Sequence, residues 1–198
     1  MPAAYDFWIK AAYTAFVAVI IPVYWRHYGW RNFLWFSDIA LFTTGAALWL
    51  ESSLLASMMA VAVLLPELLW SVSFFARLVF GMRVTDLSGY MFDPRKPLFL
   101  RALSLFHVVL PAVILWMLHR SGYDSRALVL QTVVAWLVLP ITYAVLRPED
   151  ENINWVRGFG TPQRRVAPRT YLALLMLAFP VGIYIPTHWM LQAVFGGR

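Results

Sequence analysis

The sequence predicts an all-helical protein that crosses a membrane several times. Hydrophobic types make up 61% of the 198 residues and charged types only 13%, about half the usual share of a soluble domain. Mean hydropathy is +0.66, and several apolar runs reach about 18 residues, the length that a spanning helix needs. These runs are too long for barrel strands and lack their alternation. A solvated globular domain, a disordered chain and a coiled coil are excluded.

Six membrane spans can be marked, and they form one transmembrane domain over residues 1–198. Their bounds are about 7–25, 33–51, 54–80, 98–118, 127–146 and 170–194. The first run ends in aromatic and basic residues instead of a small-residue cleavage site, so we expect it to remain in the protein. Prolines inside five of the spans predict bent helices, because each proline removes a backbone hydrogen bond. These prolines are Pro22, Pro66, Pro111, Pro140, Pro180 and Pro186.

Basic residues are divided unequally between the two ends of the predicted bundle. Twelve of the 16 lie in or beside the loops 26–32, 81–97 and 147–169. The positive-inside bias therefore places these loops in the cytoplasm and both termini on the other side, in a multi-pass protein of the inner or plasma membrane. This topology accounts for the net charge of +6, and we expect no nucleic-acid partner because no basic stripe crosses a soluble surface.

Cofactors are constrained by the residue types present. The chain has no cysteine, which excludes disulfides, cysteine zinc sites and iron–sulfur clusters. Haem is not expected, since His107 and His188 differ in depth by roughly 13 Å whereas two axial ligands must lie nearly level. No histidine pair has the spacing of a helical metal site, so we predict no metal and leave the cofactor unknown.

Ionisable residues inside the spans are the first candidates for function, because burying one in hydrocarbon costs about 2.5–3.5 kcal/mol. Glu67 follows Pro66 near the middle of the third span, and His107 lies near the middle of the fourth. We expect them to act as an acid and a base. Ser71 and Ser104 are on the same helix faces and would contact the substrate. The alternative is a structural role, with a neutral Glu67 bonded to a backbone carbonyl that a proline frees and His107 as a satisfied interior histidine.

Asp38 and Arg77 lie at matching depths on neighbouring antiparallel spans. An ion pair that clamps the two helices is one expectation, and contact with a substrate or lipid headgroup is the other. Three further polar residues lie near the outer face, where we expect plain solvation. They are Glu51, His119 and His188.

The long cytoplasmic loops carry polar residues beside aromatic ones. Asn152, Asn154 and Trp155 follow an acidic triplet, and we expect either a solvated turn or a lid that contacts a headgroup. Tyr90 and its neighbours are expected to dip into the membrane. The aromatic residues around Tyr24 and Tyr28 have the composition of an interfacial belt.

Three functions remain open, and whether the protein is an enzyme is left undecided. The first is binding or modification of an amphiphilic lipid-like or isoprenoid-like substrate from the cytoplasmic side, with Glu67 and His107 as acid and base. The headgroup would then be oriented by Asp38, Arg77, Asn152 and Asn154. The second is a small proton-coupled transporter or channel, which would require a homodimer. The third is a non-catalytic subunit of a larger membrane complex. The lipid bilayer is a partner in all three.

Overall fold

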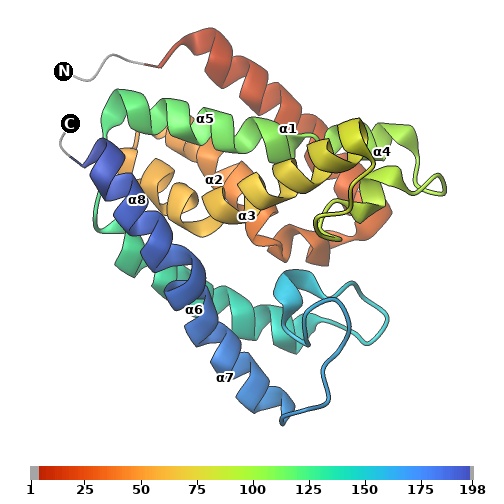
Figure 1. Ribbon diagram of the computed structural model, residues 1–198. Coiled ribbons are helices and arrows are strands. Elements are labelled where there is room, and N and C mark those ends of the chain that lie inside the picture. Colours follow the sequence, from red (N-terminus) through yellow and green to blue (C-terminus); the bar gives the residue numbers. More distant parts are fainter. Residues whose placement is uncertain (1–4, 197–198) are drawn as a thin grey trace.

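The computed structural model describes residues 5–196, and within this range the protein is all-helical without strands (Figure 1). Five helical segments are long and apolar enough to cross a membrane. They are α1 (Phe7–Tyr28), α3 (Ser53–Phe80), α4 with α5 (Leu98–Leu103 and Phe106–Ser121), α6 (Ala127–Val145) and α7 with α8 (Pro168–Phe179 and Ile185–Phe195). The protein is therefore a multi-pass helical membrane protein, while the sides of its termini stay a prediction.

The span predicted at 33–51 is the exception, and six spans are not confirmed. Trp30–Leu34 form a short 3-10 helix, η1, and α2 covers only Phe36–Leu50. Trp35 separates them with φ −58° and ψ 135°, which is outside the helical region. The 15 residues of α2 rise about 22 Å, less than the roughly 30 Å of hydrocarbon. The apolar sequence continues through the turn at Trp35, and a hydropathy pattern does not reveal a break in the helix there.

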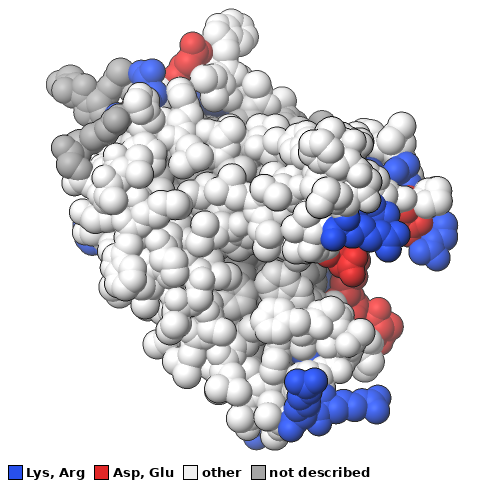
Figure 2. Space-filling model, in the orientation of Figure 1, with Lys and Arg blue, Asp and Glu red and all other residues white. Residues whose placement is uncertain are grey.

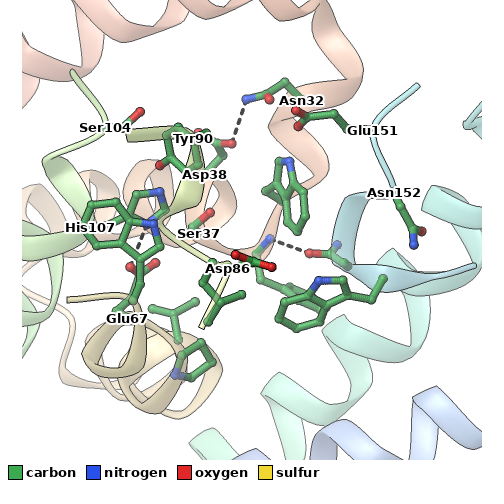
Figure 3. A pocket seen from close by; sticks show the side chains of 18 of the residues that line it. Asn32, Ser37, Asp38, Glu67, Asp86, Tyr90, Ser104, His107, Glu151 and Asn152 are labelled. Atoms are coloured by element: carbon green, nitrogen blue, oxygen red, sulfur yellow. Dashed lines mark hydrogen bonds and ion pairs between the residues drawn. The ribbon is translucent and has the colours of Figure 1, made fainter. Parts of the chain in front are cut away.

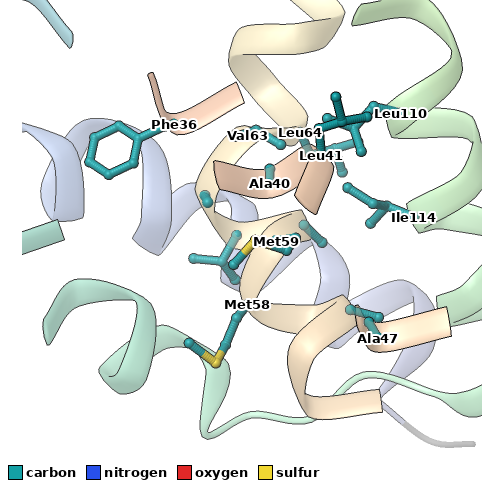
Figure 4. Packing of buried hydrophobic residues seen from close by; sticks show 14 of the residues in the cluster. Phe36, Ala40, Leu41, Ala47, Met58, Met59, Val63, Leu64, Leu110 and Ile114 are labelled. Atoms are coloured by element: carbon teal, nitrogen blue, oxygen red, sulfur yellow. The ribbon is translucent and has the colours of Figure 1, made fainter. Parts of the chain in front are cut away.

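Helix α3 is the centre of the molecule. It packs against α2, α5 and α6, and residues 56–64 are buried without interruption. Figure 4 shows Met59, Val63 and Leu64 of this stretch among side chains of α2 and α5. Several residues of 56–64 are small, which allows neighbouring backbones to approach closely. Glu67, which lies one turn further along α3, is thereby held in the interior.

Two of the long helical segments are interrupted by a change in their backbone hydrogen-bond pattern. Ser104 and Leu105 separate α4 from α5, and the Ser104 amide bonds to carbonyls three and four residues back. A single π-turn, η4 (Pro180–Tyr184), joins α7 to α8, beginning where Pro180 has no N–H to donate. Pro186 lies in the first turn of α8, directly after this π-turn. The other prolines predicted to bend spans lie inside continuous helices, and their bends remain a prediction. These are Pro22, Pro66, Pro111 and Pro140.

The two long connections lie at the same end of the molecule. One contains the 3-10 helix η2 (Gly89–Phe92), and the other contains η3 (Ile153–Trp155). In Figure 1 both are at the right, beside η1 and the start of α2. Figure 2 shows acidic side chains at this edge between two groups of basic ones. This end of the bundle therefore combines irregular backbone with both signs of charge.

Candidate functional site

A cavity of about 620 Å³ lies at the end of the bundle that carries the long connections (Figure 3). Its walls come from the end of α1, η1, the start of α2, the middle of α3, η2, the α4/α5 break and η3. Most of the wall surface is apolar, and ten of the 27 lining residues are aromatic. The rings belong to Tyr24, Tyr28, Trp35, Phe36, Trp70, Tyr90, Phe106, Trp155, Phe159 and Phe179. The cavity therefore combines a mostly apolar surface with a set of polar groups, of which the most buried are described next.

Glu67 and His107 form a hydrogen-bonded pair in the cavity wall. His107 Nδ1 lies 2.7 Å from Glu67 Oε2, and the side chains are 14% and 4% exposed. The imidazole also stacks on the Trp70 ring, with centroids 4.7 Å apart. Central α3 supplies Glu67 and α5 supplies His107 just after the break that precedes it. The structure brings these two residues together, and their roles as acid and base stay a prediction.

Asp38 is the second carboxyl group buried in the cavity wall. It lies in the first turn of α2 and is 2% exposed. Its Oδ2 accepts a hydrogen bond from Asn32 Nδ2 at 3.0 Å, while Oδ1 has no partner within residues 5–196. Trp70 Nε1 is also buried without a hydrogen bond in this range. Because buried polar atoms are nearly always paired, these two mark positions where a ligand could bind.

The expected ion pair between Asp38 and Arg77 is wrong. Arg77 does not line the cavity, and its guanidinium lies 4.4 Å from the centre of the Phe92 ring. The connection after α3 folds back and brings Phe92 of η2 over Arg77. Asp38 instead bonds to Asn32. Matching depth on two helices was therefore insufficient, because side-chain direction and loop packing decide which groups meet.

The predicted loop residues line the cavity, but their amide groups are already engaged. Asn154 Oδ1 accepts from the Phe36 amide at 3.0 Å, and Asn154 Nδ2 donates to Leu34 O at 2.7 Å. Asn152 likewise donates to Gly158 O and accepts from the backbone amide of Arg157. These contacts fasten the loop to the start of α2 and close it on itself. A role of either amide in orienting a headgroup receives no support from this geometry.

The remaining predicted residues divide between the cavity and its surroundings. Ser104 lines the cavity, and its Oγ lies 3.1 Å from the Tyr24 hydroxyl. Ser71 is outside the lining and donates to His107 O at 3.5 Å. Trp155 is a wall residue that packs edge-on to Trp35. Ser104 and Trp155 can therefore contact a ligand in the cavity, whereas Ser71 supports the backbone behind it.

Sequence reasoning missed the mouth of the cavity. Lys96 Nζ lies 5.7 Å and 5.3 Å from the ring centres of Tyr28 and Tyr90, and 3.9 Å from Glu151 Oε1. Burial raises the pKa of Tyr90, so this phenol is neutral at pH 7. The spacing of Tyr24 and Tyr28 placed both on one face of α1. That signal was assigned to membrane anchoring, although the rings face the cavity.

Residues 5–196 contain no group of three or more histidine and acidic side chains that could hold a metal ion. No protein-family profile, curated protein or solved structure matches the chain. The site is therefore interpreted from its own residues.

Proposed function

We propose that this membrane protein binds an amphiphilic, lipid-like molecule in the cavity and that the Glu67–His107 pair exchanges a proton with it. The observation that carries the proposal is the position of this pair. It is a buried hydrogen-bonded acid and base in the wall of a cavity whose surface is mostly apolar and rich in aromatic rings. Such a pair fits acid–base chemistry at the polar end of a ligand whose apolar part contacts the rings.

The size and composition of the cavity support this proposal. Sites for small molecules have volumes of about 300–1,000 Å³ and apolar walls with a few convergent polar groups, and the cavity has about 620 Å³. Histidine is the side chain whose unperturbed pKa lies nearest neutral pH. A carboxyl group bonded to Nδ1 holds the imidazole in one orientation and leaves its other nitrogen for exchange.

Transport is less well supported. A proton path would have to continue from Glu67 to the opposite end of the bundle, where Glu51 and His188 would be candidates for the exit. Glu51 Oε1 is bonded to Lys10 Nζ at 2.6 Å, and His188 Nδ1 to the Tyr123 hydroxyl at 2.7 Å. Both groups are engaged in local contacts away from the cavity. No observation favours the complex-subunit alternative.

Native mass spectrometry of protein extracted in mild detergent tests the binding. We expect the wild type to retain a lipid-sized mass and Ser37→Trp to lose it, because Ser37 lines the cavity and is only half-buried. Ser125→Trp places the same ring on an exposed loop at the other end of the bundle and serves as the control. Equal retention by both variants, or none by the wild type, would contradict the proposal.

Proton exchange is tested by the pH dependence of retention in Glu67→Gln. Glutamine keeps the shape and a hydrogen-bonding group beside His107 but cannot ionise. Wild-type retention should depend on pH if the pair exchanges a proton with the ligand, and the variant should show a different profile. Identical profiles would leave the cavity as a binding site without proton exchange.

A further inference from the structure

The cavity lining is rich in carboxyl groups, although the chain as a whole is basic. The protein has a net charge of +6, yet the cavity lining has four carboxyl groups against one lysine and one histidine. The carboxyl groups are those of Asp38, Glu67, Asp86 and Glu151. They come from α2, α3 and both long connections. An acidic lining assembled from four separate segments favours a positively charged ligand.

Asp38 provides a specific acceptor within this lining. It is 2% exposed, and Asn32 bonds to only one of its two oxygens. The other oxygen, Oδ1, has no hydrogen-bond partner in the described part of the chain. Isolating a carboxylate from water is costly unless a cation or a donor approaches it. A ligand that brings a positive charge to Oδ1 would complete the arrangement.

The chain itself shows how the cavity mouth holds an ammonium group. Lys96 Nζ lies over the rings of Tyr28 and Tyr90 and 3.9 Å from a carboxylate oxygen of Glu151. Aromatic faces attract cations through the ring quadrupole, and aromatic cages commonly recognise alkylated ammonium ligands. The same combination of rings and carboxylates continues inward to Trp70, Glu67 and Asp38. An ammonium group of a ligand in the interior would therefore have the same kind of surroundings that the Lys96 ammonium group has at the mouth.

We propose that the ligand carries an alkylammonium group, which pairs with Asp38 Oδ1 while its apolar chain contacts the aromatic wall. This inference rests on the proposed function, because it names the polar end of the amphiphile that the cavity would take. An anionic amphiphile would face the carboxyl groups, with Lys96 as the single fixed cation of the lining. A neutral amphiphile would leave Asp38 without a counter-ion, so that this buried carboxyl group would have to take up a proton.

Four probes test this assignment on the full chain in maltoside micelles. They are dodecyltrimethylammonium, dodecanol, dodecyl sulfate and tetramethylammonium, with binding measured by the shift of thermal unfolding over a titration. We expect dodecyltrimethylammonium to bind at least about tenfold more tightly than dodecanol, since an interaction with a charged partner is worth about one such factor or more. Dodecyl sulfate should give no stabilising shift. Tetramethylammonium carries the charge without the chain and distinguishes a soluble amine from an amphiphile.

Two variants locate the site. Asp38→Asn keeps an oxygen for Asn32 but removes the charge, and it should weaken binding of dodecyltrimethylammonium by about tenfold while leaving dodecanol unchanged. Glu149→Gln removes the same charge from an exposed position in the 147–169 loop and should change neither. Size-exclusion profiles and unfolding without ligand establish that Asp38→Asn is folded. If it is not, the ranking of the probes on the wild type still decides.

The outcomes separate the two proposals. Equal binding of the cation and dodecanol would overturn the alkylammonium inference and leave amphiphile binding intact. Tetramethylammonium binding as tightly as the long-chain cation, and weakened by Asp38→Asn, would support the ammonium site but overturn the amphiphile. Tightest binding of dodecyl sulfate, or no change with Asp38→Asn in a folded protein, would overturn the ammonium site. Absence of binding by every probe would contradict both proposals.

Discussion

Two acid–base contacts of almost equal length lie at different places in this protein. Lys10 Nζ is 2.6 Å from Glu51 Oε1, and His107 Nδ1 is 2.7 Å from Glu67 Oε2. The Glu51 side chain is 37% exposed at the end of α2, whereas that of Glu67 is 4% exposed within α3. Water weakens the first pair, and the interior preserves the second. Burial therefore distinguishes the two contacts where distance does not.

The neighbours of the two glutamates differ as well. Glu51 also accepts from the Tyr5 amide, and the Tyr5 hydroxyl donates to Ser121. This network is satisfied and holds chain segments together. Glu67 shares its cavity with Asp38 Oδ1 and Trp70 Nε1, which lack partners in residues 5–196. A satisfied network needs no ligand, so the Glu67 end is the one that a ligand would complete.

The largest expected effect follows from removing His107. His107→Leu leaves the Glu67 carboxyl group buried without its partner, which should lower the free energy of unfolding by about 1–3 kcal/mol. Glu67→Gln keeps a group that can bond to the imidazole and should lose less. Thermal unfolding in detergent measures both changes. If the two variants unfold at the same temperature as the wild type, the Glu67–His107 contact stabilises the fold no more than the partly exposed Lys10–Glu51 pair.

A smaller effect is expected at the loop that closes the cavity. Asn154→Ala removes the acceptor for the Phe36 amide and the donor to Leu34 O, at a cost of about 1–2 kcal/mol, similar to the loss of a helix cap. Asn154 also has φ +50°, which asparagine tolerates better than alanine. Hydrogen exchange should rise both in 147–160 and at the start of α2.

Asn152→Ala is the control for that change. Its amide bonds stay within the loop, so exchange should rise in the loop alone. Faster exchange at the start of α2 in both variants would show that Asn154 does not act as the specific fastening between the two segments.

The sequence predicted the long spans well and the cavity in part, and the residues explain why. The bounds of α1, α3 and α6 differ from prediction by three residues at most, because a long apolar run is a strong signal. Glu67 and His107 stood out through the cost of burying them. Trp35 was missed as a break, since its apolar side chain suits a turn as well as a span. Lys96 meets Glu151 only through the folding of two irregular loops, which no periodicity encodes.

Lys96 should contribute little to stability and more to ligand competition. Its contact with Glu151 is 3.9 Å long, and the Glu151 side chain is 63% exposed, so Lys96→Met should change the free energy of unfolding by less than about 1 kcal/mol. The variant removes the ammonium group that the chain holds at the mouth and should bind dodecyltrimethylammonium more tightly. Titration of both proteins at low salt measures this. Weaker binding by Lys96→Met would indicate that Lys96 assists the ligand.

The smallest effect is expected at Glu51, where pH and salt sharpen the contrast with Glu67. The hydrogen bond from Lys10 lowers the pKa of Glu51 below its ordinary 4.5. A carboxyl group with a lowered pKa stabilises the folded protein above its unfolded-state pKa, and this contribution is lost as pH falls through the folded value. Glu51→Gln should therefore unfold slightly below the wild type at pH 7, and the difference should shrink as pH falls below about 4.5.

Salt separates the Lys10–Glu51 pair, which is exposed at its Glu51 end, from the buried pair. At 1 M ionic strength the Debye length is about 3 Å, so the small difference between Glu51→Gln and the wild type should disappear at pH 7. The loss caused by His107→Leu should persist, because ions do not screen a contact from which water is excluded. Thermal unfolding at low and high salt measures both. If salt removes both the His107→Leu effect and the Glu51→Gln effect, the Glu67 pair is open to water, and burial does not distinguish it from the Glu51 pair.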